Sequence, residues 1–197
     1  MNYIDEFSEG EIFISQYLKD RRIKYRYQVK IENLKADTKS FRIADFYLPN
    51  YKVYIEFFGL WNVGGENRQN YIEKKDVYYK NNIPCVYLYP ENLGIMDLLL
   101  DFRIQRELEH KNLKRELFKY RLRSLIEDRG DLFIWLGLSI LLLFKSDYKV
   151  HPENNLIYII SLLTLAGFQI GRLYRGYERF FKNKRPINVP EFKFNRK

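Results

Sequence analysis

The stretch RIADFYLPNYKVYIEFFG, residues 42–59, gives the strongest indication of the fold. Two runs rich in apolar residues flank a turn at Pro49 and Asn50, a pattern typical of a β-hairpin. Each arm carries one acid, Asp45 or Glu56. If the turn is centred near Asn50, the two acids face each other, and directly opposed residues of antiparallel strands have Cβ atoms roughly 5 Å apart. Two carboxylates at that separation can bind one hard divalent cation, although a surface hairpin with two solvated acids would have the same spacing.

The sequence on either side of the hairpin predicts an α/β domain with a mixed sheet. Ser8 and Glu11 match a capping box, with which many helices begin, and capping alone would account for Glu11. Apolar and polar residues alternate over 25–31, as in a half-buried strand. A helical segment then leads to a short apolar strand, which indicates a crossover connection. The predicted order is a helix over 9–21, a strand over 25–31, the two hairpin strands within 42–59, an exposed polar loop over 60–70, a helix over 71–81 and a strand over 85–89.

Cysteine and histidine are too few for several kinds of site. The one cysteine, Cys85, excludes a disulfide within the chain and lies in an apolar run, which predicts a buried reduced thiol and suits the cytosol. Only two histidines occur, His110 and His151. Their scarcity argues against a Cys/His zinc module, a histidine-based metallonuclease and a Ser/His/Asp triad. Metal chemistry with oxygen ligands remains.

The net charge of +9 is unevenly distributed. Residues 1–97 carry as many acidic as basic side chains, whereas 172–197 carry 9 Lys and Arg against 2 Asp and Glu. The excess therefore lies outside the part that holds Asp45 and Glu56. It is weak evidence for nucleic-acid binding by that part, and better evidence for how the C-terminal part faces a membrane.

The C-terminal half has a different character. Residues 98–128 lack glycine and proline and mix charged with apolar residues, which predicts one long amphipathic helix that packs on the domain or pairs with a second copy as a coiled-coil homodimer. Apolar runs follow at 132–144 and 156–171. As helices they span only ~20 Å and ~24 Å against roughly 30 Å of bilayer hydrocarbon, so a buried helical hairpin stays open. Their Leu and Ile content, with Gly137 and Gly167 suited to close helix contact, favours a two-helix membrane hairpin.

Basic residues flank the two apolar runs on both sides, while the connector between them is neutral. By the positive-inside rule, both ends of the hairpin face the cytoplasm, and the N-terminal domain and both termini with them. Residues 1–7 show no secretory signal pattern, which agrees with an N-terminus inside the cell. The last segment interleaves aromatic and basic residues, as either an interfacial membrane segment or a nucleic-acid-binding arm would.

The order of the acids resembles that of a known nuclease superfamily. Glu11 lies in the opening helix after a serine, Asp45 in RIADFYLP and Glu56 in YIEFFG, and a helix with Tyr and Lys precedes an apolar strand. This order is similar to that of the PD-(D/E)XK, or restriction-endonuclease-like, superfamily. It looks most like the variants appended to some bacterial helicases and the very-short-patch-repair-like endonucleases. The resemblance covers roughly residues 8–92 and implies an αβββαβ core.

The resemblance implies a role for each matching residue. Asp45 and Glu56 would be ligands of Mg²⁺ or Mn²⁺, together with the backbone carbonyl of Phe57. Glu11 would reach the same ion directly or through water. The ion would polarise the scissile phosphate and lower the pKa of a bound water molecule.

Two positions depart from the superfamily pattern. Ala44 stands where proline is usual, and Phe58 stands where a lysine is expected to stabilise the charge of the phosphorane or to orient the attacking water. Lys74 and Lys75 on the next helix are the candidates for that role, as in relatives whose lysine has migrated there. Lys74 has the better register, with Tyr78 four residues later. Two lysines on a solvated helix face would be the ordinary interpretation.

The expected function is Mg²⁺-dependent hydrolysis of phosphodiester bonds by a membrane-anchored endonuclease, with DNA as the expected nucleic acid. One alternative is a catalytically inactive, membrane-tethered nucleic-acid-binding or scaffold protein. Another is a soluble nuclease with a helical C-terminal domain. The predicted division is a nuclease-like domain over 1–97, a charged amphipathic helix or linker over 98–130, a two-helix membrane hairpin over 131–174 and a basic cytoplasmic tail over 175–197.

Overall fold

The chain contains two compact units. The computed structural model describes residues 8–145, 152–178 and 181. Within these residues a first unit ends at Lys119 and a second begins at Tyr120. Most of the predicted basic tail, and the middle of the connector between the apolar runs, lie outside the described residues.

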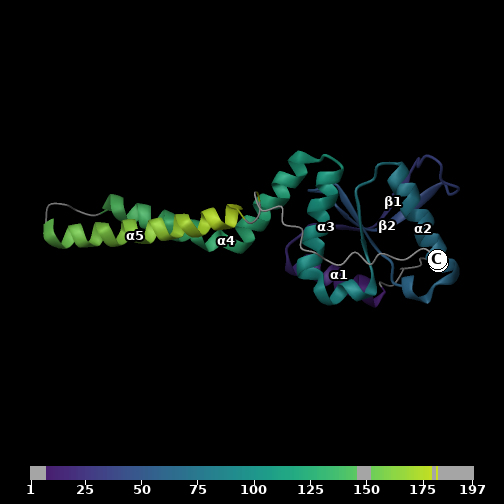
Figure 1. The fold of residues 1–197 in the computed structure, drawn as a ribbon, viewed down its shortest axis with the longest axis horizontal. Helices are drawn as coiled ribbons and strands as arrows, with labels where there is room; N and C mark the ends of the chain where they lie inside the picture. The colour runs from purple at the N-terminus through teal and green to yellow at the C-terminus, as the bar shows by residue number, and fades with distance from the viewer. Residues whose placement is uncertain (1–7, 146–151, 179–180, 182–197) are drawn as a thin grey trace. The chain divides into compact units, whose positions relative to one another are not determined.

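The first unit has an α/β fold. Its elements are α1 (Glu9–Asp20), β1 (Arg26–Glu32), β2 (Phe41–Leu48), β3 (Val53–Phe57), the 3₁₀ helix η1 (Trp61–Val63), α2 (Gly65–Lys80), β4 (Cys85–Leu88), the 3₁₀ helix η2 (Pro90–Ile95), α3 (Met96–His110) and the first turns of α4 (Lys114–Lys145). The strands form one sheet in the order β1-β2-β3-β4, antiparallel except for the parallel pair β3 and β4. Helices α1, α2 and α3 gather around this sheet (Figure 1). The predicted α/β class and mixed sheet are confirmed.

The hairpin forms with the register that the turn position predicts. Strands β2 and β3 pair antiparallel, with Leu48 opposite Val53 and Phe46 opposite Ile55. Lys52, in the turn, adopts a left-handed backbone with φ 56°. Apolar side chains of both strands are buried on one face of the sheet: Ala44, Phe46 and Leu48 from β2, and Val53 and Ile55 from β3.

Helix α1 begins with the predicted capping box. Ser8 Oγ accepts from the backbone N–H of Glu11, and the Glu11 carboxylate accepts from the Ser8 backbone N–H at 2.8 Å. The first turn of the helix packs against β3 through Gly10, where an added Cβ would overlap the Phe57 ring. Glycine is therefore needed at this position, and the contact brings the turn that carries Glu11 close to β3.

Helix α2 begins earlier than the sequence predicts. Residues 60–70 were expected to form an exposed loop, but Trp61 is buried in η1 and α2 starts at Gly65. The chain reverses at Gly64 and Gly65, whose φ values of 77° and 59° favour glycine. The loop prediction is wrong over 65–70, because Gly64 caps α2 and Gly65 is its first residue.

The far half of α2 packs on the sheet. Val77 and Tyr78 form a buried cluster with Cys85 of β4, against which Ile31 and Tyr54 of the neighbouring strands pack. Cys85 is a buried free thiol, as predicted. This packing fixes α2 beside β3 and β4.

The single long helix predicted over 98–128 is wrong. The structure has two helices there, α3 ending at His110 and α4 beginning at Lys114. Asn112 adopts a left-handed φ of 55°, and Leu113 N–H donates back to Leu108 O at 2.9 Å. Asparagine tolerates the left-handed conformation that ends many helices, so the chain turns without a glycine or proline.

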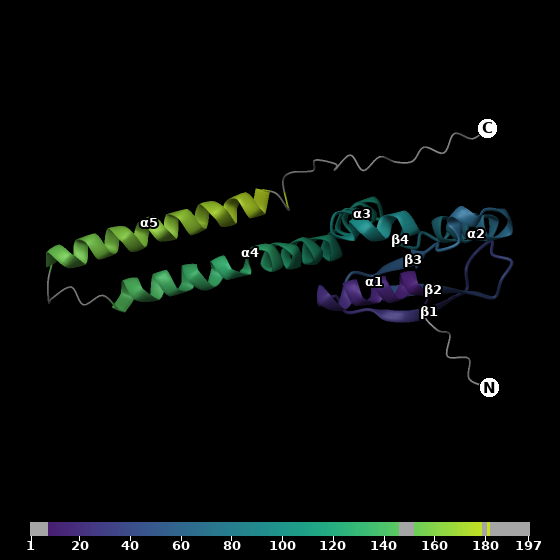
Figure 2. The same cartoon turned by 90° about the horizontal axis from the view of Figure 1, so that it is seen from below.

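The second unit consists of two long helices. Beyond Tyr120, α4 continues without a break into the first apolar run, and α5 (Pro152–Tyr177) contains the second. The two helices run side by side in opposite directions (Figure 2). They approach closely at Gly176, where an added Cβ would lie 2.9 Å from Leu125 Cδ1.

The sequence predicts close contacts at two glycines and a membrane-spanning hairpin for these helices. Gly137 and Gly167, expected at close helix contacts, have no described atom within 4 Å of an added Cβ, so the close approach is at another glycine. Among helices in the part of the chain that the structure describes, none is both long enough and apolar enough to cross a membrane. Many large apolar side chains are nevertheless exposed on the two helices, including Phe133, Ile134, Trp135, Leu138, Ile160, Leu163 and Phe168.

Candidate functional site

Two acids lie together on neighbouring strands of the first unit. The last residue pair of the β2–β3 ladder is Phe46 and Ile55, and one residue further along each strand come Asp45 and Glu56. Asp45 Oδ2 accepts the backbone N–H of Phe57 at 2.6 Å. The Glu56 side chain is only 1% exposed. The position of the turn therefore places two carboxylates side by side in a largely buried setting.

Helix α2 supplies a cation and a hydroxyl to Glu56. Lys74 Nζ lies 2.6 Å from Glu56 Oε2, and Tyr78 Oη donates to Glu56 Oε1 at 2.8 Å. Lys74 also donates to the backbone carbonyl of Ile43 at 2.7 Å. Residues four apart lie on one face of a helix, so the spacing of Lys74 and Tyr78 lets both reach the same carboxylate.

Burial dominates the electrostatics of the two acids. It raises the pKa of Asp45 to about 6, against the opposing effects of Lys74 and of the Phe57 N–H. Burial, and then the neighbouring charge of Asp45, raises the pKa of Glu56 to about 8, although Lys74 and Tyr78 act in the opposite direction. Both carboxyls therefore hold their protons to a higher pH than free carboxyls do, and a cation bound beside them would favour their ionised forms.

Glu11 lies near this pair but is engaged elsewhere. Its Oε2 accepts from Ser8 N and from Ser8 Oγ, at 2.8 and 2.7 Å. Its charge is close enough to contribute to the raised pKa of Asp45. In the described part of the chain no group of three or more His, Cys, Asp or Glu side chains is arranged to hold a metal ion.

The remaining candidates are placed as follows. Lys75 lies against Tyr87 of β4, with Nζ 5.0 Å from the centre of the ring, and burial lowers its pKa. Phe57 contributes its backbone N–H to Asp45, whereas the prediction concerned its carbonyl. Phe58, at the position where a lysine was expected, is fully buried and stacks on Tyr71 of α2 at 4.2 Å. Of the two candidate lysines, the structure brings only Lys74 to the acids.

The donor set suits a hard divalent ion better than a soft one. Asp45 and Glu56 offer only oxygen atoms, and Mg²⁺ in proteins is usually bound by one or two carboxylates while keeping several waters. Burial raises the pKa of both groups even with Lys74 beside Glu56, and a cation bound between them would offset that effect. The pair therefore offers oxygen ligands of the kind that such an ion prefers, and Glu11 stays a further predicted ligand.

No family model, no curated protein and no solved structure matches this chain. The resemblance to the PD-(D/E)XK superfamily therefore stays a prediction from the motifs.

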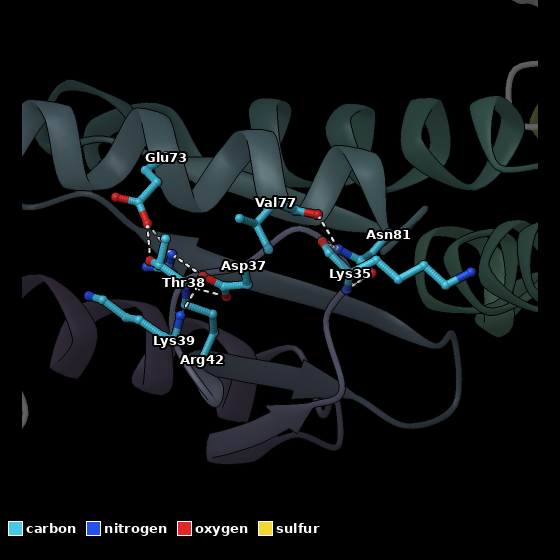
Figure 3. A network of polar contacts seen from close by, with 8 residues as sticks. All are labelled: Lys35, Asp37, Thr38, Lys39, Arg42, Glu73, Val77 and Asn81. Carbon is cyan, nitrogen blue, oxygen red and sulfur yellow. Dashed lines mark hydrogen bonds and ion pairs between the residues drawn. The ribbon is translucent and has the colours of Figure 1, made fainter.

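The sequence interpretation missed an ion network beside Lys74, in which the Arg42 and Asp37 side chains are buried and the Glu73 side chain is 40% exposed. Arg42, on β2, binds Asp37 in the β1–β2 loop and Glu73 on α2 (Figure 3). Arg42 continues the alternation of buried residues along β2 that includes Ala44 and Phe46, and it is 5% exposed. A charged residue on a buried face needs a charged partner, so the alternation in RIADF could have signalled the network, although not its partners.

Proposed function

We propose that the first unit is a divalent-metal-dependent nuclease that hydrolyses phosphodiester bonds, with DNA as its expected substrate. The observation that carries this proposal is the cluster of Asp45, Glu56 and Lys74. The buried Glu56 and the half-buried Asp45 have raised pKa values and lie side by side, with an ammonium group 2.6 Å from Glu56, so the cluster would combine a cation site with a donor for phosphate oxygens. The resemblance of the acid order to PD-(D/E)XK nucleases supports the same reaction.

Each residue has a distinct role in the proposed reaction. Asp45 and Glu56 would hold Mg²⁺ or Mn²⁺ through carboxylate oxygens, and Tyr78 orients Glu56. The ion would supply an activated water molecule and polarise the phosphate. Lys74 donates to a phosphate oxygen or to the attacking water. The water oxygen bonds to phosphorus and gives a proton to solvent, while the bond to one ester oxygen breaks and that oxygen takes up a proton, which leaves a phosphate monoester and a free hydroxyl.

Removal of either acid tests the proposal. In a nicking assay on supercoiled plasmid DNA with Mg²⁺ or Mn²⁺, Asp45→Asn and Glu56→Gln should each lower the cleavage rate at least ~100-fold, because each removes a charge that holds the ion. Asp76→Asn is the matched control, because Asp76 is exposed on α2. This variant should cleave DNA like the unaltered chain. Equal cleavage by Asp45→Asn and Asp76→Asn would contradict the assignment.

A second candidate is a scaffold or nucleic-acid-binding protein that has lost turnover. It is favoured by Phe58, which fills the expected lysine position with a buried ring, and by the engagement of Glu11 with Ser8. Calorimetric titration with Mn²⁺ separates the two candidates. The nuclease should bind Mn²⁺ with an affinity that Asp45→Asn reduces, whereas a scaffold has no reason to keep a carboxylate site that binds the ion.

We also propose that the second unit attaches the protein to a membrane, with the first unit on the cytoplasmic side. The support is compositional: large apolar side chains such as Ile134, Trp135 and Phe168 are exposed, and basic residues flank the pair of helices. After cell lysis the full chain should stay with membranes through a carbonate wash and leave them only in detergent. Release by carbonate would favour the soluble alternative.

A further inference from the structure

Arg42 lies at the centre of the ion network beside the candidate site. Its Nε and Nη2 donate to the two oxygens of Asp37 at 2.7 and 2.6 Å, and Nη2 also binds Glu73 of α2. The Arg42 side chain is 5% exposed, and the Asp37 side chain has no exposed surface. Figure 3 shows the three side chains meeting between the loop after β1 and the underside of α2.

The network is adjacent to Lys74 on both elements. Glu73 immediately precedes Lys74 on α2, and Arg42 immediately precedes Ile43 on β2. Lys74 Nζ donates to the Ile43 carbonyl in addition to its ion pair with Glu56. Two consecutive residues of α2 are thus bound to two consecutive residues of β2. Glu73 binds the Arg42 side chain, and Lys74 binds the Ile43 carbonyl.

Stability alone is a poor explanation for such a network. Removing charges from water costs several kcal/mol per ion, and well-packed apolar residues often stabilise a protein as well as a buried ion pair does. A directional network can instead fix one geometry. Lysine is long and flexible, so an ammonium group that must act at one place needs its backbone held firmly.

We propose that Glu73, held by Arg42, is a positioning residue that fixes Lys74 against Glu56. The proposal rests on the proposed function, because Lys74 is the group whose placement matters there. Asp37 in turn orients Arg42, and the hydrogen bonds from Arg42 lower the pKa of Asp37, which favours the ionised carboxylate. Glu73 touches neither substrate nor ion and acts only through its neighbour.

A second link between the same loop and α2 provides a matched control. Asn81 Oδ1 accepts from Lys35 N at 2.7 Å, and Asn81 Nδ2 donates to Lys35 O at 2.9 Å (Figure 3). Asn81 lies eight residues beyond Glu73, which is about 12 Å along the helix. Loss of this link should loosen the loop as loss of Glu73 does, but at the end of α2 away from Lys74.

The first experiment measures Lys74 directly, without reference to catalysis. The full chain, Glu73→Gln and Asn81→Ala are treated with a limiting amine-acetylating reagent, and modification of Lys74 and Lys75 is quantified by fragment mass spectrometry. Glu73→Gln should raise Lys74 labelling severalfold and leave Lys75 unchanged, while Asn81→Ala should change neither. Unchanged Lys74 labelling in Glu73→Gln would overturn the proposal, and it would do so even if the protein proved to have no nuclease activity.

The second experiment measures cleavage by the same variants. A displacement of about 1 Å at a catalytic group can cost ~100-fold in rate, so a loosened Lys74 should lower kcat about tenfold with KM within twofold. Arg42→Lys should reproduce this loss, because lysine cannot make the forked contacts of arginine. Asn81→Ala should keep kcat within twofold at a similar fall in melting temperature. Equal kcat losses in Glu73→Gln and Asn81→Ala would show a merely structural role and overturn the proposal.

Discussion

Phe58 shows at the residue scale how one side chain affects the placement of its neighbours. It stands two residues after Glu56, where the resemblance predicts a lysine, and its ring lies nearly parallel to those of Tyr71 and Trp61, with interplanar angles of 14° and 15°. The stack anchors the start of α2 to β3. Lys74 lies one helical turn beyond Tyr71, so the same contact that excludes a lysine from the strand helps to bring one from the helix.

Asp45 gives a pH-dependent prediction at this scale. The pKa values of about 6 for Asp45 and about 8 for Glu56 lie above the ordinary values of 3.8 and 4.5. These two groups therefore bind more protons in the folded chain than in the unfolded chain between about pH 4 and pH 8, and they lower the free energy of unfolding as pH rises through that window. Asp45→Asn removes one of these groups, so it should be more stable than the unaltered chain by about 2 kcal/mol at pH 8 and by about half as much at pH 5.

Denaturant unfolding at the two pH values measures this difference. Saturating Mg²⁺ should reduce the difference at pH 8, because the ion supplies the charge that the pair lacks. A stability difference that is the same at both pH values, or an Asn variant that is less stable at pH 8, would contradict the assigned electrostatics.

At the element scale, the β2–β3 turn and the helical spacing in α2 were predictable from the sequence. The contacts of the β1–β2 loop were not. The position of Pro49 and Asn50 determines which residues of β2 and β3 pair, so the meeting of Asp45 and Glu56 could be predicted from spacing alone. The choice of Lys74 over Lys75 followed from its spacing to Tyr78. The partners of Arg42 could not be predicted, because they come from a loop and a helix whose approach depends on tertiary packing.

Gly10 gives a prediction at the element scale. Alanine favours helices over glycine by ~1 kcal/mol at an unhindered position. At Gly10 an added Cβ would overlap the Phe57 ring, so Gly10→Ala should instead destabilise the protein by about 1–3 kcal/mol. Gly94→Ala is the control, since no described atom lies within 4 Å of an added Cβ there and little change is expected. Chemical denaturation checks both variants, and a Gly10→Ala protein as stable as the original would refute the close contact of α1 with β3.

At the scale of the whole molecule, composition predicted a change from an αβ pattern to long helical runs, but not where the compact units divide. The pattern changes near residue 98, whereas the first unit continues through α3 to Lys119. The break between α3 and α4 at Asn112 has no glycine or proline to mark it in the sequence. Helix α4 is continuous through the charged stretch and the apolar run at 132–144, which the sequence pattern had predicted as separate segments. Physically, a helix continues through a change of composition as long as no residue disrupts its backbone hydrogen bonds.

The role of Lys74 in the proposed site can be measured by plasmid cleavage with two neighbouring lysine variants. Lys74→Met and Lys75→Met remove the same charge from adjacent residues of α2, but only Lys74 contacts Glu56. With saturating Mg²⁺, Lys74→Met should lower the cleavage rate by about 100-fold, and Lys75→Met should stay within a few fold of the unaltered chain. Equal rates for the two variants, or a larger loss for Lys75→Met, would contradict the proposed site.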